Sequence, residues 1–446
     1  MLDLIIATKS LIKFNFFHSA AFSRLNIRLY WKKSNQRKLA QQMTTKQTIG
    51  DKVKQLRKAK GLTQTDLAGE HMTKSMLSQI ENGRALPSMN TLQFLAGRLG
   101  TDAGYFLEGE HEAELGPLVR KIEQQYKAKQ YKEIVTEIQP LMKDTLPMAV
   151  DAARLMEFYV GSCYHTGIEG GEEGIERAVE IYERFGLFVE RAKIQYLAYA
   201  LLFAKSRYQD GLELIRRVRK EYVNNKVGND FLFEIDLYYA ESVTLSALAE
   251  YSGSREAALA ALKLSHEEGV YSLSDHLYRL LSHLALLHND LEQAEAYLSK
   301  AKLFAQFTEA AESLELVHLG EIRLALAKRN YGEVLILAEH YPAKDSQFMP
   351  FVHMMTGTAL YHLERNEEAL ADLSKVVLND QVYHPLDRVD LLTAYAYKAK
   401  IFAMQGRMEE ARHEVEFAYD QVKDYPPSEY AELIRQTYHE LHDHQN

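Results

Sequence analysis

The sequence predicts an all-α protein in which a small N-terminal helical domain precedes a long stack of helix pairs. Proline and glycine are scarce, at 9 and 23 of 446 residues, so helices are seldom interrupted. Apolar residues recur at the spacing of one helical face. Short segments of related sequence also return from residue 112 onward, which is typical of helical repeat proteins.

The segment 43–110 is expected to form a domain of five helices. Its first helix, Ile49–Lys60, should end at Gly61, because glycine accepts the left-handed conformation after a last turn. Thr63 and Asp66 have the pattern of a capping box at the start of the second helix. Basic residues cover the part of the first helix that its apolar residues leave free: Lys52, Lys54, Arg57, Lys58 and Lys60.

The third helix is predicted at Lys74–Glu81, with Thr73 as its N-cap and with Leu77 and Ile80 buried. We expect Asn82-Gly83 to end it, because both residues tolerate positive φ. A fourth helix should start at Pro87-Ser88. Apolar residues along it and beyond it would complete a small core: Leu92, Leu95, Ala96, Leu99, Tyr105, Phe106 and Leu107.

This domain resembles the helix-turn-helix of the phage repressor/Cro class, the XRE family. The resemblance covers residues 49–107 and rests on three motifs. They are Thr63-Gln64 with Leu67-Ala68, the run Ser78-Gln79-Ile80-Glu81-Asn82-Gly83-Arg84, and Pro87-Ser88. The resemblance implies a sequence-specific DNA-binding domain whose third helix is the recognition helix and enters the major groove.

Two sets of polar residues are the candidate DNA contacts. The third helix would present four residues to base edges, where lysine can donate to guanine and glutamine can pair with adenine: Lys74, Ser75, Ser78 and Gln79. Flanking residues would bind phosphates, which fix register without reading sequence: Gln64, Thr73, Asn82 and Arg84. For Thr73 and Asn82 the alternative is a capping role alone.

The charge distribution supports this interpretation. Residues 43–100 carry nine Lys/Arg against four Asp/Glu, although the whole chain has a net charge of −9. A local basic region on an acidic protein is the electrostatic footprint of a DNA-binding module. Residues 111–446 have 36 Lys/Arg and 54 Asp/Glu, so we do not expect that region to bind DNA itself.

Residues 1–42 form a basic leader, with eight Lys/Arg against one acid, Asp3. They contain no apolar run long enough to span a membrane. Met43-Thr44-Thr45-Lys46 lies directly before the first predicted helix. We therefore interpret the leader as the product of a start codon assigned too far upstream, or as a disordered segment. A DNA-contacting arm is the alternative.

Residues 111–425 are predicted to form about eight tetratricopeptide-like helix pairs, followed by a C-terminal capping helix and tail at 426–446. Six related segments should mark second helices, beginning at Tyr208, Ser254, Leu291, Tyr331, Asn366 and Met408. The fourth position of the Tyr331 segment is Val334. The other five segments have a small residue there: Gly211, Ala257, Ala294, Ala369 and Ala411. Stacking such pairs buries their apolar faces and gives an α-solenoid with a concave surface.

An extended peptide is the natural ligand of such a concave surface. The first helices of the pairs should point polar residues into it: Lys193, Tyr196, Tyr239, Ser242, Arg279, His283, Arg323, Tyr361, Tyr397 and Lys400. The tyrosines and the cations among them can hold a peptide backbone and its carboxylate. The alternative is that half of them are ordinary solvated or packing residues.

A helix-turn-helix followed by such repeats resembles the Rap/NprR/PlcR/PrgX group of peptide-responsive regulators of Gram-positive bacteria, with an NprR/PlcR-like layout. The resemblance implies a cytoplasmic homodimer of the quorum-sensing type, in which a short imported signalling peptide changes DNA binding or activation. Those receptors typically place asparagines on their inner helices. The equivalent positions here hold other residues: Leu197, Val243, Leu280, Gly320, Met355 and Tyr397.

Two other functions stay open for the repeat region. It could bind a protein partner, such as a phosphorelay response regulator, through the first repeats at 112–144, or it could only dimerise a constitutive repressor. The single cysteine, Cys163, fits a reducing cytoplasm and excludes a disulfide framework. No phosphate loop or nucleophile elbow appears, so we expect neither an enzyme nor a cofactor, metal or membrane partner.

Overall fold

A computed structural model describes most residues from Ile49 to Asp443. Outside the description lie residues 1–48, 70, 83–86, 88, 102–104, 107–111, 144–145, 226–230, 310, 344–345, 379–383, 424 and 444–446. The basic leader, Gly83, Arg84 and Leu107 are therefore not described. The chain divides into two compact units. The N-terminal unit runs to Leu202 and includes Glu213–Asp230, and the C-terminal unit comprises Phe203–Leu212 and Phe231–Asn446.

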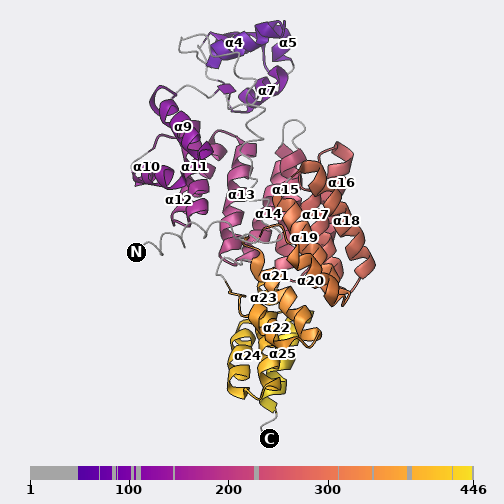
Figure 1. Ribbon diagram of the computed structural model, residues 1–446. Helices are drawn as coiled ribbons and strands as arrows, with labels where there is room; N and C mark the ends of the chain where they lie inside the picture. Colours follow the sequence, from indigo (N-terminus) through magenta and orange to yellow (C-terminus); the bar gives the residue numbers. More distant parts are fainter. Residues whose placement is uncertain are drawn as a thin grey trace. The chain divides into compact units, whose positions relative to one another are not determined.

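The described regular structure is helical throughout, as the sequence predicts (Figure 1). The first four helices are α4 (Ile49–Ala59), α5 (Gln64–Ala68), α6 (Lys74–Glu81) and α7 (Met89–Leu99). Gly61 has φ +68°, so it follows α4 in the left-handed conformation that its position requires. Thr63 and Asp66 form a reciprocal capping box at α5, and the Thr73 hydroxyl accepts from the backbone N–H of Met76 at 3.1 Å.

One detail of this domain differs from the expectation. Asn82 ends α6 at φ −99° rather than at positive φ, so the left-handed explanation is wrong for this residue. Its backbone N–H and its side-chain amide both donate to the Ser78 carbonyl, at 3.1 and 2.8 Å, which satisfies that carbonyl without a left-handed turn. Tyr105 and Phe106, which the sequence assigns to the small core, are both helical.

The rest of the chain follows the predicted pattern of consecutive helix pairs. Within the described residues the pairs are α9 (Glu112–Lys127) and α10 (Tyr131–Lys143), α11 (Val150–Thr166) and α12 (Gly171–Arg184), α13 (Phe188–Ala204) and α14 (Tyr208–Asn225), α15 (Phe231–Ala247) and α16 (Tyr251–Glu268), α17 (Ser274–Leu287) and α18 (Leu291–Thr308), α19 (Ala311–Ala327) and α20 (Tyr331–Glu339), α21 (Met349–His362) and α22 (Asn366–Leu373), and α23 (Pro385–Met404) and α24 (Met408–Val422), followed by α25 (Glu429–His442).

The turn inside each pair repeats the same backbone conformation. In seven pairs, the residue two positions before the second helix has positive φ: Lys129, Ser206, Ala249, Asn289, Arg329, Glu364 and Gly406. Six of them are not glycine, so the turn geometry holds them in a region that side chains disfavour. The fourth position of every predicted segment is buried, Val334 included, so this position packs the second helix onto the first.

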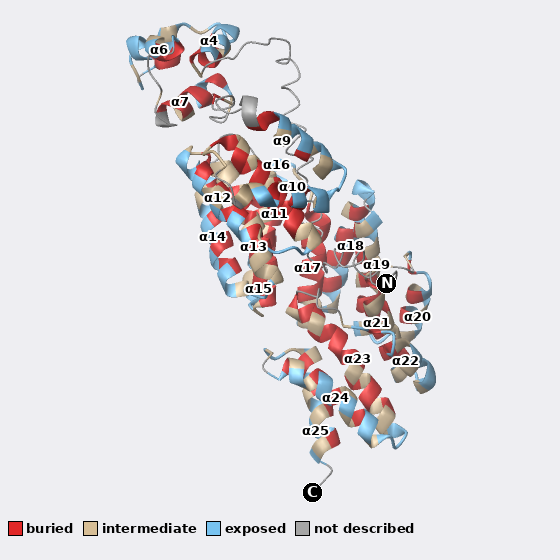
Figure 2. Ribbon diagram, turned by 90° about the vertical axis from the view of Figure 1, so that its left-hand side faces the viewer, coloured by how far each residue is buried: buried red, intermediate tan, exposed pale blue. Residues whose placement is uncertain are grey.

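First helices form an inner layer in the C-terminal unit. Each contacts the first helix of the next pair from α17 through α19 and α21 to α23, while each second helix packs on its own partner. Helix α17 is buried along most of its length, whereas α24 has many exposed residues (Figure 2). Helix α15 also contacts α23, although three helix pairs separate them in the sequence. Within the described part of the chain, no helix combines the length and apolar character that crossing a membrane requires.

Candidate functional site

Helix α6 is anchored through its last residue, Glu81. The guanidinium of Arg57 on α4 donates to both Glu81 carboxylate oxygens, at 2.5 and 2.9 Å, and the amide of Gln64 on α5 donates at 2.9 Å. Burial raises the pKa of Glu81, but the hydrogen bonds from Arg57 and Gln64 outweigh burial and leave the pKa below its usual range. Glu81 therefore stays ionised and fixes the position of α6 against α4 and α5.

The surface of α6 opposite this anchor is accessible. Leu77 and Ile80 are buried, as expected, and an α-helix turns by about 100° per residue, so Ser75 and Gln79 lie on the far side. Of the predicted base-reading residues, Lys74, Ser75 and Gln79 are exposed. Ser78 is half-buried. Sequence reasoning missed Met76, which is 41% exposed beside them. Its sequence offers no signal, because an apolar residue in an amphipathic helix is usually assigned to the core.

Three of the four predicted phosphate contacts have intramolecular partners in this structure. Gln64 is held on Glu81, Thr73 caps α6, and Asn82 bonds to Ser78. Arg84 lies outside the described residues. The expectation that Lys52 and Arg57 cover the free surface of the first helix is wrong, because both are buried. Arg57 is buried because its guanidinium pairs with the Glu81 carboxylate. The Lys52 ammonium donates to the backbone carbonyl of Tyr105 at 2.9 Å.

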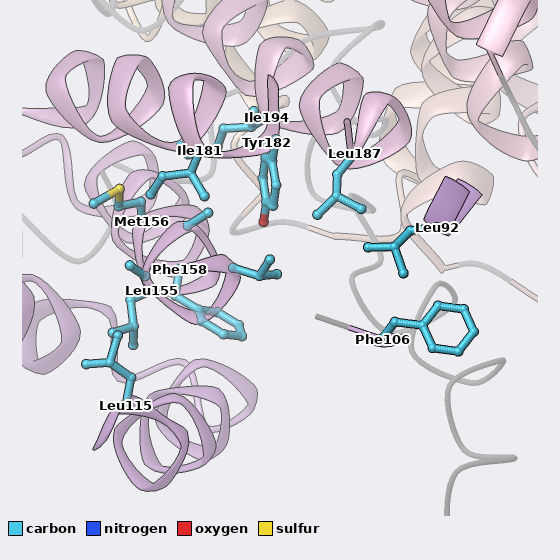
Figure 3. Close-up of a cluster of buried hydrophobic side chains, with 14 of the residues drawn as sticks. Leu92, Phe106, Leu115, Leu155, Met156, Phe158, Ile181, Tyr182, Leu187 and Ile194 are labelled. Carbon is cyan, nitrogen blue, oxygen red and sulfur yellow. The ribbon is translucent and has the colours of Figure 1, made fainter. Parts of the chain in front are cut away.

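A side chain of α7 connects the helix-turn-helix to the turn between α12 and α13. The amide of Gln93 donates to the backbone carbonyl of Gly186 at 2.7 Å. The next residue, Leu187, is buried in the same apolar cluster as Leu92 and Phe106 (Figure 3). The core of the small domain thus continues into the repeat helices of the N-terminal unit.

The C-terminal unit brings two of the predicted groove residues into direct contact. Nη1 of Arg323 on α19 lies 3.0 Å from Nε2 of His283 on α17. Nη2 of Arg323 forms an ion pair of 2.7 Å with Asp390 on α23. Nearby, Ser246 Oγ on α15 lies 2.8 Å from Nε2 of His384, the residue that precedes α23. These contacts cross the inner layer from α15, α17 and α19 to the first turns of α23.

Burial changes the protonation of this cluster. It lowers the pKa of His384 to about 4 and that of His283 well below its usual value, so both imidazoles are neutral at pH 7. The Arg323 charge lowers the pKa of His283 further. The pKa of Asp387 is raised to about 8, mainly by burial; the Arg323 charge opposes this rise and the neighbouring Asp390 adds to it. Asp390 is shifted upward in the same way, again mainly by burial.

The remaining predicted groove residues occupy separate places. Arg279 faces Asp275 at 3.9 Å, and the Ser242 hydroxyl donates to the Ser254 carbonyl at 2.8 Å. The other contacts in the C-terminal unit are Tyr239 with His276 (6.0 Å between rings), Tyr361 with Tyr397 (5.1 Å between rings) and Lys400 with Glu440 (3.7 Å). In the N-terminal unit, Tyr196 is buried with its ring 5.8 Å from Tyr199, and Lys193 is half-buried.

Sequence reasoning missed the acids of this cluster. Asp387 and Asp390 lie in the first turns of α23, where acids are ordinary because they complement the helix dipole. Their spacing of three residues was the available signal, since it places both carboxylates on one helical face. Among the described residues, no group of three or more His, Cys, Asp or Glu is arranged to hold a metal ion.

Comparisons with known proteins identify the N-terminal domain. Residues 53–106 match a helix-turn-helix family model, so this segment is a helix-turn-helix domain. The immunity repressor protein of Bacillus phage phi105 is 32% identical over 98 residues. That alignment covers 22% of this chain and 64% of the repressor, so the chain spans less than two thirds of that relative's length.

The chain is also similar to parts of solved structures. Bacillus thuringiensis PlcR, in complex with the peptide PapR7 and DNA, is 20% identical, with a TM-score of 0.40 over 60% of this chain and 98% of PlcR. The apo form of the competence regulator ComR from Streptococcus vestibularis is 18% identical, with a TM-score of 0.32 over 60% of this chain and 95% of ComR.

Proposed function

We propose that the chain is a sequence-specific DNA-binding transcriptional regulator whose repeat region binds a short signalling peptide and transmits that event to the helix-turn-helix. The accessible surface of α6 is the observation that carries the DNA-binding part. It combines an anchored helix with Lys74, Ser75 and Gln79 on its free side, in a segment that matches a helix-turn-helix model. Such residues can hydrogen-bond to base edges in a major groove.

Met76 extends this reading surface. Its thioether side chain is apolar and exposed between Ser75 and the buried Leu77. An apolar side chain in the major groove makes favourable contact with the methyl group of thymine. We therefore include Met76 with Lys74, Ser75, Ser78 and Gln79 among the residues that read bases. Arg84, Gln64, Thr73 and Asn82 remain the proposed phosphate contacts.

The peptide-binding part is supported by the inner layer of the C-terminal unit. Polar and charged side chains from several first helices meet there: Arg323 lies within hydrogen-bond distance of His283 and forms an ion pair with Asp390. Apolar packing alone does not require such a cluster, because burying charged groups costs free energy unless they are well paired. In the N-terminal unit, the bond from Gln93 to Gly186 links α7 to a turn of the repeats. A rearrangement of α13 would reach the helix-turn-helix through this bond.

A homodimer in the cytoplasm is the assembly that fits this proposal. Helix-turn-helix proteins of this kind bind two half-sites about one helical turn apart, so the operator mirrors the twofold symmetry of the dimer. The repeat region would then set the distance between the two recognition helices. A peptide that changes this distance would change the affinity for a fixed operator.

The experiment that tests the proposal is a binding titration with the full chain and DNA from the region flanking its own gene. It is run with and without synthetic peptides encoded by small open reading frames beside that gene. A peptide-dependent change in DNA affinity is expected. Sequence-specific binding that no peptide alters would leave the DNA-binding part standing and overturn the peptide part. It would then favour a constitutive repressor or a regulator controlled by a protein partner.

A further inference from the structure

Two buried carboxylates, Asp387 and Asp390, both interact electrostatically with Arg323 in the inner layer of the C-terminal unit. Asp387 and Asp390 are 1% and 3% exposed, and Arg323 forms its ion pair with Asp390. The two histidines that face this cluster, His283 and His384, are neutral at pH 7 because burial lowers the pKa of each. With both acids ionised, the described residues of this cluster would therefore carry one negative charge more than Arg323 balances.

Asp387 is the group with the unmet requirement. Its Oδ2 atom is buried and has no hydrogen-bond partner among the described residues. A position in the first turn of α23 favours a negative charge through the helix dipole, but it supplies no donor to this oxygen. A buried ionised carboxylate without a donor is costly, so the group either binds a proton or receives a cation. In the unliganded protein the proton does this, which is why the pKa of Asp387 is raised to about 8.

We propose that Asp387 is the anchor of a subsite for a cationic group, an ammonium or a guanidinium, carried by the ligand of the repeat region. The proposal rests on the peptide-binding function above and specifies its ligand chemistry. The cation would replace the proton, donate to Oδ2 and balance the second carboxylate, while Arg323 continues to pair with Asp390. Charge-assisted bonds of this kind are the strongest that a buried carboxylate accepts.

Helix α15 contacts α23 at a point close to Asp387 in the sequence. Ser246 Oγ and His384 Nε2 lie 2.8 Å apart, and both side chains are buried. His384 is three residues before Asp387 in the sequence. Asp387 is 1% exposed, so a ligand reaches it only after neighbouring elements move apart, and we infer that this end of α23 separates from α15. Breaking the bond therefore opposes ligand binding. Removing the Ser246 hydroxyl should lower that cost and strengthen binding.

The test uses the full chain and two matched libraries of synthetic hexapeptides, one with free amino termini and one acetylated. Peptides retained by the wild-type protein, by Asp387→Asn and by Asp420→Asn are identified by mass spectrometry. Asp387→Asn keeps the size of the side chain and removes its charge. Asp420→Asn removes the same charge from an exposed position on α24 and is the matched control.

The proposal predicts that the wild type and Asp420→Asn enrich cationic peptides over neutral ones, and that Asp387→Asn loses this preference. The affinity of a retained cationic peptide should fall about thirtyfold or more in Asp387→Asn, since one partner of a buried charge pair is lost. It should rise in Ser246→Ala. Enrichment confined to the unacetylated library assigns the amino terminus as the cation, whereas enrichment of Lys or Arg in both libraries assigns a side chain.

Two results separate this proposal from the function on which it rests. Retention of peptides without a preference for cations, equal in the wild type and Asp387→Asn, overturns the subsite and leaves peptide binding intact. If no peptide is retained, the cation subsite is tested by thermal unfolding in the presence of agmatine. Agmatine carries both a guanidinium and an ammonium. A rise in Tm for the wild type but not for Asp387→Asn keeps the cation subsite and overturns peptide binding, because a ligand that binds the folded state stabilises it. No rise in either protein overturns both.

Discussion

Arg57 and Glu81 meet at two points, with Nε to Oε1 at 2.5 Å and Nη2 to Oε2 at 2.9 Å. The Glu81 side chain is fully buried and that of Arg57 nearly so. Arg57 also donates to the Leu62 carbonyl at 2.8 Å, just before α5. This ion pair therefore joins the three helices that hold the reading surface, although it makes no contact with that surface itself.

Replacing Glu81 by Leu should destabilise the helix-turn-helix by about 3–5 kcal/mol, because it leaves the Arg57 charge buried without a partner. The double variant Arg57→Met with Glu81→Leu should recover most of that loss, since an apolar pair of similar volume has no charge to bury. Urea unfolding of the full chain, followed by hydrogen exchange in α4–α6, measures both. Equal stability of the wild type and Glu81→Leu would contradict the role assigned to the ion pair.

Lys74→Ala should cost about 1–3 kcal/mol of DNA affinity at one base position and little at the others. Arg84→Ala should weaken binding to every sequence alike and reduce the dependence of affinity on salt, as the loss of a phosphate contact does. Titrations against a set of duplexes with single base changes distinguish the two. A uniform loss for Lys74→Ala would remove it from the base-reading residues.

Asp387 should make the stability of the protein depend on pH between about 6.5 and 8. Its pKa is about 8 in the folded chain, against an ordinary value near 3.8. The stabilisation that this proton gives the folded state is fully present below the ordinary pKa and is lost as the pH rises through the folded pKa. The free energy of unfolding therefore falls with rising pH. Below about 6.5 the buried histidines act in the opposite direction, because their lowered pKa values make the unfolded state bind more protons.

The difference between wild type and Asp387→Asn isolates this effect. Relative to the variant, the wild type should lose up to about 1.4 kcal/mol for each pH unit in that window. Thermal or urea unfolding of both proteins at pH 6.5, 7.2 and 8 gives the slope. Parallel curves would show that Asp387 is ionised in the folded protein at pH 6.5.

Ala249→Gly should raise the free energy of unfolding by about 0.5–1 kcal/mol. Ala249 lies in the turn between α15 and α16 at φ +59°, a conformation that costs a residue with a Cβ atom about 1–2 kcal/mol. Glycine removes this cost, but its more flexible unfolded chain offsets part of the gain in stability. The control is Ala296→Gly on the exposed surface of α18, which should lose about 1 kcal/mol. Chemical unfolding of both variants gives the two values, and a loss in both would contradict strain at Ala249.

The sequence predicts most of the fold because its signals are local. Thr63, Asp66 and Thr73 act through backbone groups within three residues, and they stand at the predicted helix starts. The second helices α14, α18, α20, α22 and α24 begin at the predicted residues, since each is marked by a repeated motif. The end of α6 was explained wrongly because Asn82 can end a helix either by a left-handed turn or by bonding back to Ser78.

The site was less predictable because its contacts are long-range. Nothing near Lys52 and Arg57 in the sequence indicates that they are buried, since their partners lie 53 and 24 residues away. The pairing of Arg323 with Asp390, and of Ser246 with His384, depends on how the helix pairs from α15 to α24 stack. Repeat register gives the face on which a residue lies but not its distance from a helix several pairs further along.

Sequence-specific recognition by α6 is tested most directly by selecting duplexes from a random library with the full chain. The affinity for the selected operator is then compared with that for a scrambled duplex of equal composition at the same salt concentration. The account predicts a preference of about 10³ or more for the operator, lost in the double variant Ser75→Ala with Gln79→Ala while binding to the scrambled duplex is unchanged. Equal affinity for operator and scrambled DNA, or a preference that survives the double variant, would contradict it.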